Sequence, residues 1–346
     1  VKQWDRMRGP PQDKLKMVKS ALPRLGLGMA ALGRPGYINL DRSKIFGNDE
    51  RTVESMQKAA EQVIDSLFEN AEHPWLDCAR SYGLSEKFVG EYLRTRKIAP
   101  DKVFVSSKWG YTYVANWKVS LETPDAKHEV KDHSTENFLK QVQESNELMG
   151  EYIDLYQIHS ATFDSGILDD TRAHEALAEC RKERGWKLGL SVSGVEQDEI
   201  LRAARKIHAQ NDDDGKPLFD SVQCTFNLLE QRPAEALREA ASAGMDIIIK
   251  EGLANGRVLR NPTVLDYAQK LGCEADQLAL GFILAQDFQP RVLSGAVTTE
   301  QLVSNLKAAE VAEKLRKDPT LLQEIGEGCK MESKDYWSER SALAWN

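Results

Sequence analysis

Residues 75–93, WLDCARSYGLSEKFVGEYL, place two structural patterns next to each other. The stretch begins with a short apolar run, which is typical of a buried strand. From Ser85 onward, apolar residues such as Phe88 and Tyr92 recur at the spacing of one helix face. The segment therefore predicts a strand followed by an amphipathic helix, with a polar loop between them.

The same strand-then-helix pattern recurs along the chain. Short apolar runs rich in β-branched residues predict strands at residues 25–30, 75–79, 103–109, 153–159, 188–193, 221–227, 246–250 and 292–297. Helical periodicity predicts helices at residues 52–70, 85–96, 135–149, 171–184, 197–209, 233–244, 263–285 and 299–309. Eight such units are typical of a closed parallel barrel with an outer ring of helices, the (β/α)8 barrel. An open doubly wound parallel sheet shows the same alternation and is the structural alternative.

No break in composition divides these units, so we expect a single domain over residues 1–346. Its barrel core should span about residues 24–310, after a basic lead at 1–23. The extension at 311–346 is expected to add a helix on the outside. The segment 110–133 is longer than most connections between a strand and a helix, which predicts a lid or a binding element.

Composition limits the classes of partner. The 346 residues carry a formal net charge of −8, which argues against nucleic acid as a partner. No stretch approaches the roughly 20 apolar residues that a membrane span needs. The five cysteines are scattered and form no CxxC pair, which predicts a soluble protein of a reducing compartment without disulfides or a metal site. The sequence begins at Val1 and not at a methionine. We therefore expect either a cytoplasmic protein or an organelle protein whose transit peptide has been removed.

Four chemically capable residues fall where predicted strands end. Asp77, Lys108 and His159 lie at the ends of the second, third and fourth strands, and Tyr82 lies in the loop after the second. In a barrel these strand ends meet at one face, where active sites form. Three of them also have a structural explanation: a loop cap for Asp77, a half-buried ring for Tyr82 and a core histidine for His159. Lys108 is harder to explain in this way, because a charged group at the end of an apolar strand needs a partner or solvent. Their convergence at one face favours the chemical interpretation.

Together these groups are suited to carbonyl reduction, which needs a hydride at carbon and a proton at oxygen. A tyrosine with its usual pKa near 10 is a weak acid at neutral pH, and we expect the ammonium of Lys108 to lower that pKa. Asp77 would hold the lysine in place. His159 would orient the carbonyl or help to pass the proton.

The segment LDCARSYGLSEKFVGEYL at residues 76–93 resembles the signature of the aldo-keto reductase family. VFVSSKWG at 103–110 resembles the family's lysine strand, and YIDLYQIHS at 152–160 resembles its histidine strand. Similar correspondences follow in the family's order, namely GLSVSG at 189–194, SVQCTFNLLE at 221–230 and SGAVTTEQLVSNLKA at 294–308. The resemblance covers most of the chain and implies the barrel fold. It also implies that Tyr82 is the general acid and base of a tetrad with Asp77, Lys108 and His159.

The resemblance further implies a set of cofactor contacts. Ser191 and Gln223 should bind the nicotinamide carboxamide, and Phe226 should stack on the ring, with a core role as its alternative. Asn227, on the family's glutamine and asparagine strand, should also contact the cofactor. The remaining contacts are expected at a loop over the pyrophosphate, with Lys250, Gly252 and Leu253, and at the adenosine end, with Gly295, Thr298, Gln301 and Asn305.

The sequence departs from the family pattern at three positions. Val192 stands where members usually carry asparagine, which puts one carboxamide contact in doubt. Gly295 and Gln301 stand where many members place a lysine and an arginine for a 2′-phosphate. The resemblance therefore favours NADP(H) over NAD(H) only weakly.

Loops at the mouth would select the substrate. We expect the pocket to be lined by Met29, Tyr37, Trp109, Tyr111 and Phe163. Aromatic side chains suit an apolar or planar carbonyl compound or a sugar ring, although some of them could instead anchor loops to the barrel. The predicted function is an NADP(H)-dependent oxidoreductase that interconverts a small-molecule carbonyl and an alcohol, acting as a monomer or a small homo-oligomer. The alternatives are a redox-sensing accessory subunit of a larger complex, as in the family's potassium-channel β subunits, and an NAD-dependent aldose dehydrogenase.

Overall fold

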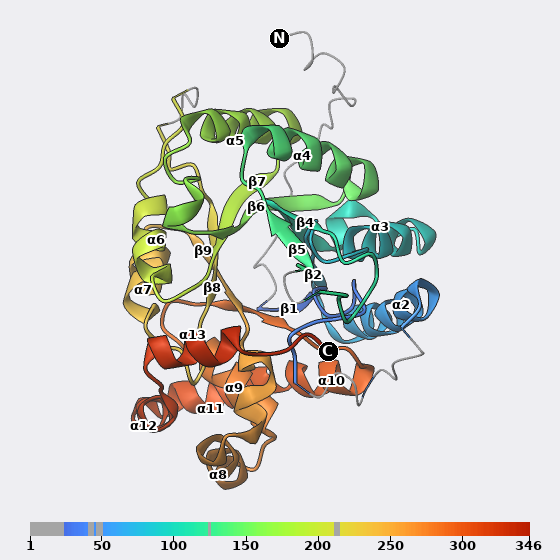
Figure 1. Ribbon diagram of the computed structural model, residues 1–346. Helices are drawn as coiled ribbons and strands as arrows, with labels where there is room; N and C mark the ends of the chain where they lie inside the picture. Colours follow the sequence, from blue (N-terminus) through green and yellow to red (C-terminus); the bar gives the residue numbers. More distant parts are fainter. Residues whose placement is uncertain (1–23, 41–44, 46–50, 124–125, 211–214) are drawn as a thin grey trace.

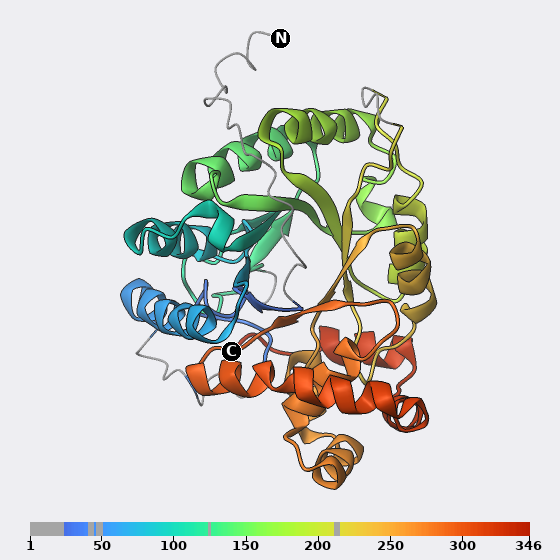
Figure 2. The same cartoon turned by 180° about the vertical axis from the view of Figure 1, so that it is seen from behind.

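The computed structural model describes residues 24–40, 45, 51–123, 126–210 and 215–346. Parallel strands close into a barrel that helices surround (Figures 1 and 2), in the order β1-β10-β9-β8-β7-β6-β3-β2. The barrel strands are β1 (Leu25–Gly28), β2 (Trp75–Asp77), β3 (Phe104–Trp109), β6 (Ile153–Ala161), β7 (Lys187–Val192), β8 (Ser221–Thr225), β9 (Asp246–Lys250) and β10 (Arg291–Ser294). The closed barrel confirms the predicted fold class and excludes the open sheet. The predicted lead at 1–23 lies outside the described residues.

Helices follow the strands as the alternation predicts. The α-helices are α2 (Val53–Asn70), α3 (Ser85–Thr95), α4 (Thr135–Met149), α5 (Thr171–Arg184), α6 (Gln197–Ala204), α7 (Ala234–Ser242), α8 (Pro262–Leu271), α9 (Ala275–Leu284), α10 (Thr299–Leu306), α11 (Ala308–Lys317), α12 (Pro319–Cys329) and α13 (Ser333–Ser341). Among the described residues, 3-10 helices accompany them at η3 (Pro100–Lys102), η4 (Phe163–Ser165) and η5 (Ala254–Arg260). Within the described residues, no helix combines the length and the apolar character that crossing a membrane requires.

The prediction of one helix over residues 263–285 is wrong. Gly272 adopts a left-handed conformation with φ of 65° and ends α8. Glu274 then forms a capping box with Gln277, which starts α9. A glycine followed by a capping box is a stop and a new start, and the apolar periodicity on both sides concealed it.

The long segment 110–133 contains an antiparallel pair of strands that the periodicity did not reveal. These strands are β4 (Tyr111–Tyr113) and β5 (Glu129–Lys131). Tyr111 pairs with Lys131 and Tyr113 pairs with Glu129. Figure 1 shows the pair in front of the barrel, beside the ends of β2 and β6. The strand pair β4–β5 therefore lies at one face of the barrel.

The C-terminal extension returns to this same face. Its last residue, Asn346, exchanges two backbone hydrogen bonds with Tyr37, at 3.0 and 3.1 Å. The ring of Trp345 stacks on His128, with centroids 3.9 Å apart and planes 3° apart. In Figure 1, α13 and the C-terminus lie in front of the barrel strands. The residues after α13 therefore reach the barrel mouth, whereas α11 and α12 of the same extension pack against the outer helices α9 and α8.

A compact apolar cluster fills the barrel below the site. Trp75, Phe104, Leu155, Ile248 and Leu293 pack together there, each no more than 8% exposed. The indole nitrogen of Trp75 donates to the Ser106 hydroxyl at 3.0 Å. Because this layer is apolar, the polar residues at the strand ends form the chemically distinct part of the barrel interior.

Candidate active site

A buried charge pair joins the ends of β2 and β3. Nζ of Lys108 donates to Oδ2 of Asp77 at 2.5 Å and to the carbonyl oxygen of Cys78 at 2.8 Å. The other carboxylate oxygen of Asp77 accepts from the Ser106 hydroxyl at 2.7 Å and from the Gln223 amide at 3.2 Å. The two charged side chains are 0% and 2% exposed. A buried pair is stable only when most of its remaining hydrogen-bonding capacity is satisfied. These contacts satisfy the carboxylate and two of the three N–H groups of the ammonium.

Tyr82 lies directly above this pair. Nζ of Lys108 is 4.7 Å from the centroid of the Tyr82 ring. The His159 ring meets the Tyr82 ring edge-on, with centroids 5.4 Å apart. In the described part of the chain, the Tyr82 hydroxyl makes no hydrogen bond. The structure thus brings the four predicted residues together and leaves the phenol hydroxyl available.

The pKa of Tyr82 moves in the direction opposite to our expectation. Burial raises it well above its ordinary value, and the Asp77 carboxylate raises it further, while Arg34 opposes the shift. The Asp77 carboxylate, 2.5 Å from the ammonium of Lys108, opposes the lowering that we expected from that ammonium. Tyr82 therefore keeps its proton at neutral pH and is suited to act as an acid.

Arg34 is a site residue that sequence reasoning missed. It is 2% exposed, and its guanidinium lies 5.2 Å from the Tyr82 ring centroid and 4.8 Å from that of Trp345. Nη1 donates to the Ser81 carbonyl at 2.9 Å and to the Glu129 carboxylate at 2.8 Å. Arg34 thus ties the loop of Tyr82 to β5. The available signal was a charged residue inside the otherwise apolar stretch before Pro35.

His159 lies near the end of β6, where the pairing with β7 shifts register after Ile158. Its Nδ1 is 3.3 Å from the Ser81 hydroxyl. His133, which the sequence analysis did not single out, places Nε2 2.8 Å from the His159 carbonyl oxygen. Burial lowers the pKa of His159 well below its ordinary value, and the cations Lys108 and Lys250 lower it further. His159 is therefore a neutral imidazole at physiological pH.

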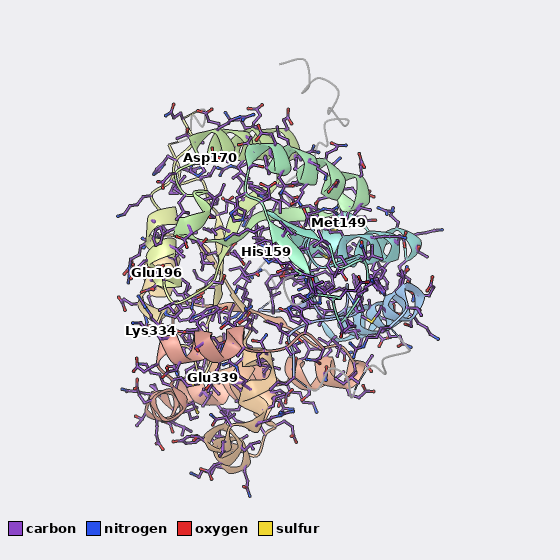
Figure 3. All side chains as sticks on the ribbon, viewed as in Figure 1. Met149, His159, Asp170, Glu196, Lys334 and Glu339 are labelled. Atoms are coloured by element: carbon purple, nitrogen blue, oxygen red, sulfur yellow. The ribbon has the colours of Figure 1, made fainter. Side chains whose placement is uncertain are left out.

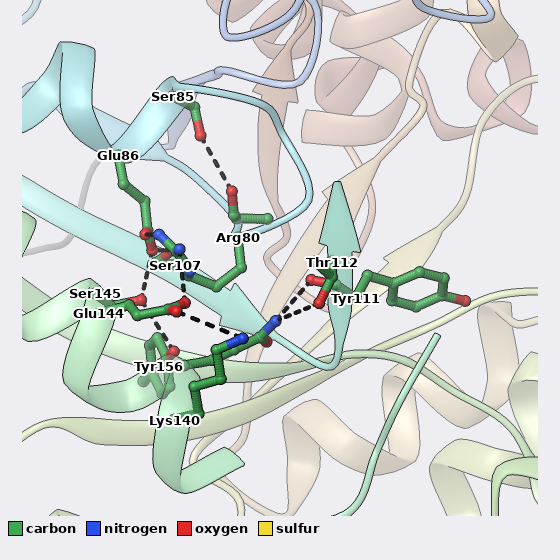
Figure 4. A network of polar contacts seen from close by, with 12 residues as sticks. Arg80, Ser85, Glu86, Ser107, Tyr111, Thr112, Lys140, Glu144, Ser145 and Tyr156 are labelled. Carbon is green, nitrogen blue, oxygen red and sulfur yellow. Dashed lines mark hydrogen bonds and ion pairs between the residues drawn. The ribbon is translucent and has the colours of Figure 1, made fainter. Parts of the chain in front are cut away.

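A buried polar network supports β3 beside Lys108 (Figure 4). Glu86, 2% exposed, accepts hydrogen bonds from the hydroxyls of Ser107 at 2.6 Å and Ser145 at 2.7 Å. Arg80 completes the network by donating to Glu86 at 2.5 Å and to Glu144 at 2.7 Å. These bonds link α3, β3 and α4, so the strand that carries Lys108 is held from its outer side.

Ser191 and Gln223, predicted to bind the nicotinamide, and Lys250, predicted to begin the pyrophosphate loop, lie on the neighbouring strands β7, β8 and β9, and each already makes a hydrogen bond within the protein. The Ser191 hydroxyl oxygen accepts from the backbone N–H of Ser160 at 2.7 Å. Nζ of Lys250 donates to the Thr225 hydroxyl at 2.8 Å. Gln223 donates to Asp77, as described above. Ser191 still has its hydroxyl hydrogen to donate, as a carboxamide oxygen would require.

The predicted adenosine end is the turn between β10 and α10. The Thr298 hydroxyl caps α10 by accepting from the Gln301 N–H at 3.3 Å. Asn305 accepts from the Ser294 hydroxyl and donates to Asp276, both at 2.6 Å. A Cβ atom built on Gly295 would meet no atom within 4 Å, so there is open space beside this turn. The capped helix start and this open space fit the phosphate end of a dinucleotide.

The helix α13 covers part of the predicted cofactor loop. Arg340 forms an ion pair with Glu251 at 2.6 Å. Burial raises the pKa of Glu251, but Arg340 and Lys250 outweigh it and hold the pKa at about 2. The amide of Asn227 donates to the hydroxyl of Tyr336 on α13 at 3.0 Å. In Figure 3, the labels of Lys334 and Glu339 mark α13 on the side of the barrel mouth nearest to α9, apart from His159.

The aromatic pocket predictions divide into two groups. Trp109 is fully buried and packs on Phe138 with centroids 4.9 Å apart, so it does not line a pocket. Phe226 stacks on Phe282 of α9 at 6.0 Å, which places it in the core. Met29 is also fully buried, and Phe163 is 45% exposed.

Two other predicted residues lie beside the tetrad. The ring of Tyr111 is 5.0 Å from that of His159. Tyr37 meets the edge of Trp345 at 6.1 Å, and the Arg34 guanidinium is 4.9 Å from its ring. Trp345 was not predicted, because nothing in its local sequence indicates that the C-terminus reaches the mouth. Tyr37, Tyr111 and Trp345, here called the aromatic wall, therefore lie beside Arg34 and His159, the two residues that flank the Tyr82 ring.

Comparisons with known proteins agree with this geometry. A family model described as the Aldo/keto reductase family matches residues 24–326. An uncharacterized oxidoreductase, YqkF, of Bacillus subtilis is 23% identical over 305 residues, which cover 79% of this chain and 89% of that protein. The solved holo form of aldo-keto reductase AKR11C1 from Bacillus halodurans superposes with a TM-score of 0.62 at 20% identity, covering 90% of this chain and 94% of that one.

A second solved structure, the putative aldo-keto reductase PA4992 of Pseudomonas aeruginosa, gives a TM-score of 0.60 at 22% identity. It covers 88% of this chain and 95% of the other. At these identities the structures establish the shared fold, whereas the family match spans most of the chain. The chain therefore belongs to the aldo/keto reductase family of oxidoreductases.

Proposed function

We propose that the protein interconverts a small-molecule aldehyde or ketone and the corresponding alcohol, with a nicotinamide dinucleotide as the hydride carrier. The observation that supports this most is the unshared hydroxyl of Tyr82 above the Lys108–Asp77 pair, on a residue that is only 8% exposed. A phenol that keeps its proton and faces no protein acceptor is suited to protonating a bound carbonyl oxygen.

The cofactor would supply a hydride to the carbonyl carbon. Tyr82 donates its proton to the carbonyl oxygen, so that the C=O bond becomes a CH–OH group and a phenolate remains. The ammonium of Lys108 stabilises this phenolate, and Asp77 holds the ammonium below the ring. His159 stays neutral and orients the carbonyl oxygen by a hydrogen bond.

For the cofactor we propose NADP(H), with only a small preference over NAD(H). Gly295 and Gln301 supply no cation for a 2′-phosphate, while the helix start at Thr298 favours an anion. Glu300 in the first turn of α10 carries a negative charge and opposes that effect. Titrating the tryptophan fluorescence of the protein with NADPH and with NADH measures the ratio of the two dissociation constants. A dissociation constant for NADPH that is lower than that for NADH by up to about tenfold supports this proposal, since tenfold corresponds to about 1.4 kcal/mol. A lower dissociation constant for NADH, or a preference for NADPH far beyond tenfold, would contradict it.

The aromatic wall of Tyr37, Tyr111 and Trp345 supports a planar or apolar carbonyl compound as substrate. The test of the reaction is to mix the protein with NADPH and a panel of aromatic, aliphatic and sugar aldehydes, and to follow NADPH absorbance. Turnover of at least one carbonyl supports the enzyme. Tight NADPH binding with no turnover, in a large assembly, would support an accessory subunit instead. Oxidation of an aldose with NAD⁺ alone would support an aldose dehydrogenase.

A further inference from the structure

The ring and the backbone of His159 each have their own contact in the structure. Its Nδ1 is 3.3 Å from the hydroxyl of Ser81, a fully buried residue. In the described part of the chain, that hydroxyl has no other hydrogen-bond partner, and Nε2 of His159 has none. We propose that Ser81 is a positioning residue, which donates its hydroxyl hydrogen to Nδ1 of His159 and thereby leaves the N–H of Nε2 for the carbonyl oxygen. This inference rests on the proposed function.

The tautomer matters because His159 is neutral. Burial and the cations Lys108, Lys250 and Arg34 all disfavour its protonation, so the ring carries one N–H. A carbonyl oxygen between Tyr82 and His159 can only accept hydrogen bonds, so both residues must donate to it. The other tautomer would present a lone pair of Nε2 to that oxygen and repel it. Ser81 can favour the productive tautomer because a hydroxyl can donate to a bare Nδ1.

The backbone around His159 is fixed independently of Ser81. His133 donates from Nε2 to the His159 carbonyl at 2.8 Å, and the Ser160 N–H donates to the Ser191 hydroxyl at 2.7 Å. Ser160 has a positive φ of 52°, which marks the irregular end of β6. Arg34 in turn holds the Ser81 carbonyl at 2.9 Å. Because the backbone on each side has its own anchor, removing the Ser81 hydroxyl should change the tautomer of the ring and leave the fold intact.

The test compares Ser81→Ala with Ser81→Thr, which keeps the hydroxyl. Ser66→Ala, a buried serine on α2, is the matched control. Loss of a correctly oriented hydrogen-bond donor should lower kcat of Ser81→Ala by about tenfold to a hundredfold. The dissociation constant for NADPH should be unchanged. Ser81→Thr should recover most of the activity, and Ser66→Ala should match the parent.

Nitrogen-15 NMR of histidine-labelled protein saturated with NADP⁺ reads the tautomer directly, with His159→Gln to assign the signal. The parent should show a protonated Nε2 and a bare Nδ1, and Ser81→Ala should show a mixture. A parent protonated at Nδ1, or a Ser81→Ala variant with parental kcat, would overturn the inference. The variant Tyr82→Phe separates a failure of the Ser81 inference from a failure of the proposed function. If Tyr82→Phe is inactive while Ser81→Ala is fully active, only the role of Ser81 fails. If Tyr82→Phe is active, the proposed function itself fails.

Discussion

The ammonium of Lys108 lies 2.5 Å from the carboxylate of Asp77, with both side chains buried at the ends of adjacent strands. The pair places a cation below the Tyr82 ring without leaving a net buried charge. This explains how the site can hold a protonated phenol and still stabilise the phenolate that forms when the proton leaves.

Removing one member of this pair should be worse for stability than removing both. Lys108→Met leaves a buried carboxylate without its partner, at a cost of about 3–5 kcal/mol in the free energy of unfolding. Asp77→Asn combined with Lys108→Met should recover most of that loss, while turnover stays absent in both variants. Urea denaturation measures the stability, and NADPH consumption measures turnover. A double variant as unstable as Lys108→Met would show that the pair is not coupled in this way.

The pH dependence of kcat should differ between carbonyl reduction and alcohol oxidation. Because burial raises the pKa of Tyr82 well above its ordinary value, the acid form that carbonyl reduction needs persists through neutral and mildly alkaline pH. Alcohol oxidation needs the phenolate, whose fraction rises about tenfold per pH unit below the pKa. We expect kcat for reduction to stay flat from about pH 6 to 9 and kcat for oxidation to rise over that range. A fall in the reduction rate centred near pH 7 would contradict the assignment.

His133 should make the fold sensitive to acid. Burial lowers its pKa from 6.5 to about 4, so the unfolded chain binds a proton at a higher pH than the folded protein does. Stability is therefore fully present above pH 6.5 and falls as the pH drops toward 4, by on the order of 3 kcal/mol from this residue. Comparing urea denaturation at pH 7 and pH 4.5 tests this. His133→Gln should lose less stability between the two values than the parent, and equal losses would contradict the prediction.

Gly33 should tolerate no side chain, because it packs against the loop of Tyr82. A Cβ atom there would lie 2.3 Å from the Tyr82 carbonyl oxygen and 2.5 Å from Cβ of Ser85. Gly33→Ala must displace this loop, so we expect a loss of about 1–3 kcal/mol and a lower kcat. Gly328→Ala on α12 is the control, because its nearest contact would be an ordinary 3.6 Å. Equal stability and activity of the two variants would show that the loop has room to adjust.

The barrel could be predicted because its determinants are local. Each strand and helix is encoded by its own apolar spacing, and the closed parallel arrangement places strand ends together. Once the barrel was assumed, the convergence of Asp77, Lys108, Tyr82 and His159 followed from their positions at strand ends. The raised pKa of Tyr82 did not follow, since it depends on burial and on the distance between Lys108 and Asp77.

The missed residues act through contacts between distant segments. Trp345 reaches His128 and Arg34, and no local pattern indicates where the C-terminus returns. Arg340 on α13 reaches Glu251 in the same way. Ser81 and His133 contact His159 from other elements, and a lone serine or histidine has no periodicity to reveal it. Sequence patterns predict which strand ends meet, but such partners require the three-dimensional structure.

The most direct test of the account is Tyr82→Phe, which removes one hydroxyl and keeps the ring. The control is Tyr92→Phe, whose hydroxyl donates to Asp65 at 2.8 Å between two outer helices. Both variants are assayed with NADPH and an aldehyde that the parent reduces, and cofactor binding is followed by tryptophan fluorescence. We predict that Tyr82→Phe loses at least about a hundredfold in kcat with an unchanged NADPH dissociation constant, while Tyr92→Phe turns over like the parent. A Tyr82→Phe variant that reduces the aldehyde at the parental rate would contradict the central claim.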